Sequence, residues 1–113
     1  MSVIIYHNPR CSKSRQTLQL LQQQGIEPRI IEYLNQPPSL AELRKLLTLL
    51  RLTPQQLVRR GDAKQLGIDI DALSDEEVIK ALHTTPQLIE RPIVINNGKA
   101  AIGRPPQAVL NIL

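Results

Sequence analysis

The first 33 residues alternate between two apolar runs and one amphipathic segment, and this pattern constrains the fold more than any other. Val3–Tyr6 is typical of a short buried strand, and the β-branched segment Arg29–Tyr33 predicts a second strand. Between them Leu18 and Leu21 recur at helical spacing, and Gly25 is well suited to end a helix. A strand, a helix and a strand in this order predict a βαβ unit with parallel strands.

The middle of the chain carries several signals for helices. Ser39–Glu42 and Ser74–Glu77 both match the capping box that starts a helix, and leucine, isoleucine or valine follows each at helical spacing. Thr53–Pro54 predicts a further helix that ends near Arg60–Gly61, with a threonine cap and a proline at the first helical position. Thr85–Pro86 predicts one more short turn. This region therefore forms a helical block between two sheet-forming regions.

Strand patterns return after the helical block. Pro92–Asn96 predicts a strand, Asn97–Gly98 is a two-residue hairpin signal, and Lys99–Ile102 predicts the returning strand. Pro105 is a suitable first residue for a last helix, whose apolar face comprises Ala108, Val109, Ile112 and Leu113.

We therefore predict an α/β chain of thioredoxin-like topology. Residues 1–113 form a single domain, with a helical insertion at about 39–90. The predicted order is β-α-β, the helical insertion, then β-β-α, which gives a four-stranded mixed sheet.

The only cysteine, Cys11, falls where the first strand passes into the first helix. Amide groups and the helix dipole at that point favour anions, so they lower the pKa of a thiol there. Arg10, Lys13 and Arg15 add positive charge, with no acidic residue between Tyr6 and Arg15. The segment thus offers a nucleophile beside a site for a small anionic substrate. The alternative is a buried core thiol, which rarely sits in a polar cationic loop.

Three neighbours of this loop are candidate supporting residues. His7 either lowers the Cys11 pKa or hydrogen-bonds the loop, and the sequence leaves both open. Ser14 either caps the helix or hydrogen-bonds the thiolate, and capping is favoured. Pro92 opens a strand where a constrained turn is needed, so it is a candidate cis-proline. The predicted topology places Cys11 near Arg91–Pro92.

The composition argues against several function classes. The net charge is +4 and the pI is about 9.6, but the basic residues are dispersed and no Phe or Trp is present to stack on bases. One cysteine excludes an internal disulfide and suits a reducing compartment. No signal peptide or membrane span is recognisable. We expect a cytoplasmic monomer without a nucleic-acid or membrane partner, a metal or a tightly bound cofactor.

Four segments together resemble the glutaredoxin-coupled arsenate reductase family. They are His7–Arg15, Glu32–Pro38, Arg91–Val94 and Gly103–Pro105, and the similarity extends from the first strand to Leu113. Well-characterised arsenate-resistance members carry Cys-Gly-Thr-Ser-Arg in the loop. The Cys-Ser-Lys-Ser-Arg of this chain is more similar to a chromosomal subgroup.

The resemblance implies a mechanism and a set of site residues. Cys11 attacks arsenate, glutathione acts as cosubstrate on the resulting adduct, glutaredoxin resolves the mixed disulfide, and arsenite is released, as in arsenic detoxification. Arg91 and Arg104 match two arginines that bind the oxyanion. Arg59 matches a third, with Arg60 as a competitor, and His7 matches a histidine that helps to lower the cysteine pKa. Ser14, Arg15 and Pro92 support the site.

Two other functions stay open. A related branch consists of redox-linked transcription regulators that bind RNA polymerase without catalysis, but those usually carry Cys-x-x-Cys, and Ser14 occupies the second position here. A glutathione-dependent thiol reductase acting on another substrate needs the same reactive cysteine and anion site.

Overall fold

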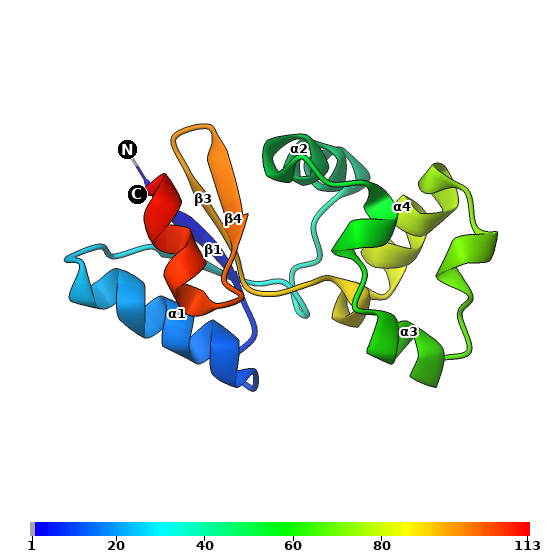
Figure 1. Ribbon diagram of the computed structural model, residues 1–113, viewed down its shortest axis with the longest axis horizontal. Helices are drawn as coiled ribbons and strands as arrows, with labels where there is room; N and C mark the ends of the chain where they lie inside the picture. The colour runs from blue at the N-terminus through cyan, green and yellow to red at the C-terminus, as the bar shows by residue number, and fades with distance from the viewer. Residues whose placement is uncertain (1) are drawn as a thin grey trace. The chain divides into compact units, whose positions relative to one another are not determined.

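The computed structural model describes residues 2–113 as two compact units (Figure 1). The sheet unit combines the chain up to Gln36 with Arg91–Leu113, and the helical unit is Pro37–Glu90. The helical unit thus has bounds close to the insertion expected at about 39–90. That residues 1–113 act as a single domain stays a prediction.

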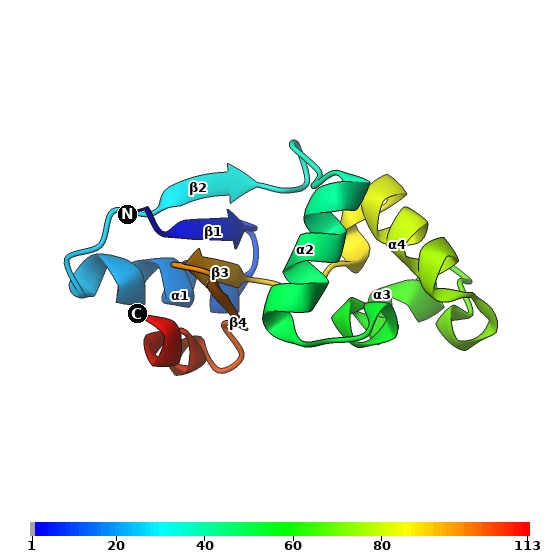
Figure 2. The same cartoon turned by 90° about the horizontal axis from the view of Figure 1, so that it is seen from above.

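The sheet unit contains a four-stranded mixed sheet in the order β2-β1-β3-β4 (Figure 2). Its strands are β1 (Ile4–His7), β2 (Arg29–Glu32), β3 (Ile93–Asn96) and β4 (Lys99–Ile102). The central β1 pairs parallel with β2 and antiparallel with β3, and β3 pairs antiparallel with β4. The predicted mixed sheet and the βαβ unit are confirmed.

The hairpin between β3 and β4 turns at Asn97 and Gly98. Their φ angles are 52° and 76°, the left-handed values that a two-residue turn of this kind requires. The predicted turn is confirmed. This turn fixes the register in which Ile93 pairs with Ile102. The start of β3 and the end of β4 therefore lie next to each other at the open end of the hairpin.

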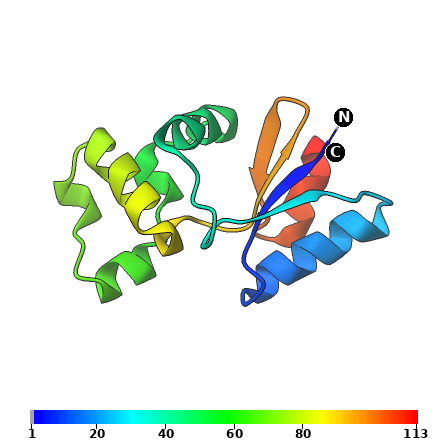
Figure 3. The same ribbon diagram turned by 180° about the vertical axis from the view of Figure 1, so that it is seen from behind.

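One face of the sheet is covered by α1 (Ser12–Gln23) and the 3₁₀ helix η4 (Pro106–Ile112), which lie side by side (Figure 3). Between the helices and the sheet lies a core that includes the fully buried residues Ile5, Leu21, Val94 and Val109. Their burial holds the start of α1 against the end of β1, where Cys11 lies.

The last helix differs from the prediction. It begins at Pro106 instead of Pro105, and it is a 3₁₀ helix. Pro105 keeps an extended conformation with ψ 166°, because a residue that precedes a proline is disfavoured from the α region.

The helical unit is built from six short helices. Its α2 and α4 both begin with the predicted capping box, in which Ser39 pairs with Glu42 and Ser74 with Glu77. No helix within residues 2–113 is long and apolar enough to cross a membrane. The six helices are α2 (Leu40–Leu50), η1 (Pro54–Leu57), α3 (Arg60–Gln65), η2 (Ile70–Ala72), α4 (Asp75–Thr84) and η3 (Pro86–Leu88).

The helix predicted from Thr53 begins as expected, with Thr53 as its cap and Pro54 as its first residue, but its predicted end near Arg60–Gly61 is wrong. The chain forms the short η1, becomes extended at Val58 and starts a new helix at Arg60. Val58 forms an isolated antiparallel bridge with Ile89, flanked by backbone hydrogen bonds of 2.7 Å from Arg59 and 2.8 Å from Glu90. A buried β-branched residue bonded to a distant segment thus overrides the local helical pattern.

Candidate active site

Cys11 is the N-cap residue of α1, as the sequence predicts. Its backbone is extended, its amide donates to the Asn8 carbonyl at 3.0 Å, and its carbonyl accepts from the Arg15 amide at 3.0 Å. The residue is partly exposed. A thiol that solvent reaches at the start of a helix can react with a dissolved substrate, which argues against the buried core thiol.

The environment of Cys11 favours its thiolate. Partial burial raises the pKa of the thiol, but hydrogen bonds from the Ser14 amide, the Arg91 side chain and the Lys13 amide outweigh it, together with the positive charge of Arg91. The pKa of Cys11 is therefore lowered from its ordinary value. The predicted effect of the helix start is present, and it acts through the amides of the first turn.

His7 and Ser14 form a buried pair behind the nucleophile. The His7 Nδ1 lies 2.6 Å from the Ser14 hydroxyl, which also accepts from the Asn8 amide at 3.0 Å. The expected capping role of the Ser14 side chain is wrong. Ser14 lies in the first turn with its hydroxyl directed at the end of β1, while its amide faces the Cys11 sulfur.

The surroundings of His7 favour one of its two expected roles. Burial lowers the pKa of His7, the Glu32 carboxylate raises it and Arg15 lowers it further, with a net downward shift. His7 is therefore neutral near pH 7. A neutral ring bonded to Ser14 fits the loop-holding reading, whereas a cation beside the thiolate would be needed to lower the Cys11 pKa directly.

The loop before Cys11 is fixed by side chains that bond to its backbone. Asn8 accepts from the Arg10 amide through Oδ1 at 3.0 Å, and the Arg15 guanidinium donates to the Pro9 carbonyl at 2.9 Å. Arg15 therefore supports the loop. Sequence reasoning missed Asn8, although an asparagine before a proline is a common start of a turn.

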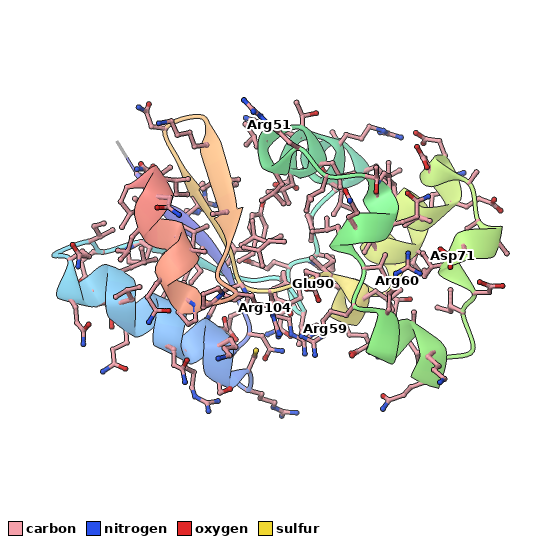
Figure 4. All side chains as sticks on the ribbon, in the orientation of Figure 1. Arg51, Arg59, Arg60, Asp71, Glu90 and Arg104 are labelled. Carbon is pink, nitrogen blue, oxygen red and sulfur yellow. The ribbon has the colours of Figure 1, made fainter. Side chains whose placement is uncertain are left out.

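Arg91 and Arg104 meet at the end of the β3–β4 hairpin. The Arg91–Pro92 peptide bond is cis, as expected for Pro92, and the Arg104–Pro105 bond is cis as well. Arg104 Nε donates to the Arg91 carbonyl at 3.0 Å, while the Arg91 side chain donates to Cys11. The sheet unit thus gathers the nucleophile and both predicted oxyanion-binding arginines in one place, with Arg104 labelled in Figure 4.

Arg59 and Arg60 belong to the helical unit and differ in their surroundings. Arg60 is exposed and pairs with Asp71 at 3.1 Å, and the two side chains point toward one another (Figure 4). Arg59 Nε contacts Asp62 at 3.4 Å, whereas its buried Nη1 has no hydrogen-bond partner among residues 2–113. The structure therefore favours Arg59 over Arg60 as an anion ligand. The role of Arg59 stays a prediction.

The side chains of the site do not resemble a set of metal ligands. Within the described chain, residues 2–113, no cluster of three or more His, Cys, Asp or Glu residues is placed to hold a metal ion. The arrangement offers a thiolate flanked by amides and arginines, which is suited to nucleophilic attack on an anion.

Comparison with known proteins places the chain in a family. The profile of the ArsC family matches residues 6–112. The chain belongs to the ArsC family. A protein named arsenate reductase from Haemophilus influenzae is 51% identical over 100% of both chains. The Escherichia coli K12 protein named "Uncharacterized protein YfgD" is 49% identical over 98% of this chain and 96% of its own.

Solved structures support the same assignment of this ArsC-family chain. The arsenate reductase from Vibrio cholerae superposes with a TM-score of 0.89 at 49% identity, and the match covers 100% of this chain and 98% of that one. The family resemblance and the thioredoxin-like α/β fold predicted from the sequence are thereby confirmed. The roles of the individual site residues stay predictions.

Proposed function

We propose that this chain reduces arsenate to arsenite through a covalent adduct on Cys11, with glutathione and glutaredoxin as the reductants. The observation that carries the proposal is the position of Cys11 as the N-cap of α1, where the first-turn amides and the Arg91 guanidinium lower the pKa of its thiol. Relatives that match the whole chain are named arsenate reductases, which supports arsenate as the anion.

Substrate binding follows from the charges around the sulfur. Arsenate is a tetrahedral anion, and planar guanidinium groups bind two oxygens of such an anion at once. Arg91 supplies a guanidinium group to Cys11, and Arg104 is bonded to the Arg91 carbonyl. The family resemblance implies that Arg59 is the third arginine that binds the anion. Neutralising the substrate lets the negatively charged thiolate approach arsenic.

The first chemical step forms the adduct. The Cys11 thiolate donates an electron pair to arsenic, a sulfur–arsenic bond forms, and one arsenate oxygen leaves as water after protonation. Arsenic stays in the +5 state. The amides of Lys13 and Ser14 remain after the sulfur has lost its charge, and they can then donate to the arsenate oxygens.

Reduction requires thiols from outside the chain, because one cysteine cannot store two electrons as an internal disulfide. Glutathione sulfur bonds to arsenic and displaces a second oxygen as water. A glutaredoxin thiolate then attacks the glutathione sulfur, and the electron pair of the broken bond stays on arsenic, which becomes +3. Water releases arsenite and restores Cys11. One arsenate and two thiols thus yield arsenite, one mixed disulfide and water. We assign the reaction to the cytoplasm, because thiols are kept reduced there.

The test is a coupled assay in which glutathione reductase links turnover to NADPH consumption. The wild type should consume NADPH only when arsenate, glutathione and glutaredoxin are all present. Cys11→Ser should abolish turnover, because a serine hydroxyl is not ionised near pH 7. The proposal would be refuted if Cys11→Ser retained turnover. It would also be refuted if the wild type consumed NADPH at the same rate with and without arsenate.

A further inference from the structure

A groove of about 410 Å³ runs beside the loop that precedes Cys11. Residues 7–10 form one wall, and Glu32, Leu34 and Asn35 form the other. Because β1 and β2 are parallel, their carboxyl ends reach the same edge of the sheet, and the groove lies between the segments that leave them. The whole groove belongs to the sheet unit.

Both walls are held by hydrogen bonds within the chain. On one side the Cys11 amide donates to the Asn8 carbonyl, and the Asn8 side chain accepts from the Arg10 amide, each at 3.0 Å. On the other side the amides of Asn35 and Gln36 both donate to the Glu32 carbonyl at 2.9 Å. A groove whose backbone is fixed in advance binds a ligand with little further loss of conformational entropy.

The groove carries two opposite charges that do not neutralise each other. Arg10 and Glu32 are both exposed, and no ion pair or side-chain hydrogen bond within residues 2–113 engages the Arg10 guanidinium or the Glu32 carboxylate. Leu34, 42% exposed, adds apolar surface to the groove. A simple dianion such as arsenate would be repelled by Glu32, so the groove suits a ligand with charges of both signs.

We propose that this groove binds the peptide part of the thiol cosubstrate. A zwitterionic peptide such as glutathione would place a carboxylate on Arg10, its ammonium group on Glu32 and its apolar methylene groups against Leu34. Arg10 lines the groove and directly precedes Cys11, so a peptide held there would lie against the loop that ends at the nucleophile. The inference rests on the proposed function, because it identifies where the external thiol binds for the reduction step.

Direct binding is measured with S-methylglutathione, which keeps the peptide charges but cannot react. Titration calorimetry on the whole protein should show binding, and Glu32→Gln and Arg10→Gln should each weaken it about tenfold by removing one charge-assisted hydrogen bond. Glu27→Gln and Arg29→Gln are the matched controls, since both remove an exposed charge of the sheet unit outside the groove. N-acetylated S-methylglutathione, which lacks the ammonium group, should bind wild type as weakly as S-methylglutathione binds Glu32→Gln.

Steady-state kinetics give a second readout. Glu32→Gln should raise KM for glutathione about tenfold, whereas Glu27→Gln and Arg29→Gln should leave it unchanged. A protein that binds S-methylglutathione but does not reduce arsenate would refute the proposed function and keep the groove. Absence of S-methylglutathione binding to the wild type, or equal binding by the groove variants and their controls, would overturn the groove assignment while arsenate turnover stands.

Discussion

Arg91 contributes to the site through both its side chain and its backbone. Its guanidinium donates to the Cys11 sulfur, and its carbonyl holds Arg104 at 3.0 Å. One residue therefore lowers the thiol pKa and orients the second cation. The side chain can be changed while its backbone carbonyl stays, so these two contributions can be separated by mutation.

Arg91→Gln should raise the pKa of Cys11, because it removes a hydrogen bond and a positive charge from the thiolate. Thiolate forms as the pH rises through the pKa, so the midpoint of iodoacetamide alkylation against pH should move upward. Arg91→Lys keeps the charge and should shift the midpoint less. It should still raise KM for arsenate about tenfold or more, because the planar fork is lost.

Arg29→Gln provides the control for this pair, since Arg29 is an exposed arginine on β2 of the same unit. Its alkylation profile and its KM for arsenate should match the wild type. An Arg91→Gln profile that coincides with both would show that Arg91 does not act on the thiol.

At this scale the sequence reveals which residues react, but not how they are oriented. Cys11 is recognisable because it stands alone in a cationic loop at a helix start, and topology alone brings Arg91 near it. The Ser14 hydroxyl could not be assigned, because its choice between capping and His7 depends on how β1 packs against α1. Glu32 was missed as a groove residue, although the parallel β1 and β2 predict that their carboxyl ends meet.

At the scale of elements, α1 packs tightly against Gly103, the residue that follows β4. A Cβ atom built there would collide with the buried Thr17 hydroxyl and would lie 2.8 Å from Cγ of Pro92. The Gly103 amide donates to the Pro92 carbonyl at 2.9 Å, so the backbone cannot retreat without breaking a hydrogen bond. Gly103 therefore sets the spacing between the nucleophile helix and the arginine hairpin.

Gly103→Ala should destabilise the protein by about 1–3 kcal/mol, the usual cost of overpacking a filled interior. It should also slow alkylation of Cys11 at neutral pH, because α1 and Arg91 are forced apart. Urea unfolding and the alkylation rate measure the two effects.

Gly61→Ala is the matched control, because nothing lies within 4 Å of a Cβ there and the residue is helical. It should leave both quantities unchanged or raise stability slightly. Adding Thr17→Ala to Gly103→Ala should restore part of the lost stability, since it removes the colliding side chain. Loss of stability in Gly61→Ala but not in Gly103→Ala would contradict the packing argument.

The elements that sequence patterns locate best are those with their own start signals. The two capping boxes predict α2 and α4, and Asn97–Gly98 predicts the hairpin, because these signals act within a few residues. The break at Val58 and the 3₁₀ geometry of η4 were not predicted. The break depends on a bridge to Ile89, which is distant in sequence, and η4 depends on consecutive prolines beside the sheet.

For the whole molecule, the groups that set the Cys11 pKa all belong to the sheet unit. Leu21 and Leu82 are both fully buried, but Leu21 lies in α1 of that unit and Leu82 lies in α4 of the helical unit. Leu21→Ala and Leu82→Ala should each destabilise the protein by about 2–5 kcal/mol in urea unfolding. Only Leu21→Ala should raise the midpoint of Cys11 alkylation, because α1 carries the Lys13 and Ser14 amides.

Each of these two variants serves as the control for the other, since both delete the same atoms from a buried site. The pH midpoints of Cys11 alkylation are compared without urea, at a temperature at which both variants are folded. Equal upward shifts of the midpoint would show that Cys11 reactivity follows global stability instead of the local structure of the sheet unit.

The division of the sheet unit into two chain segments also fixes the order in which a ribosome completes the site. Cys11 is made before the helical unit, whereas Arg91 and Arg104 follow only after it. At about 5–20 residues per second, the nascent thiol spends several seconds without its guanidinium partner. During that time its pKa lacks the contribution of Arg91, and it reacts less readily with oxidants. Full reactivity is therefore acquired only after the helical unit and Arg91 have been translated.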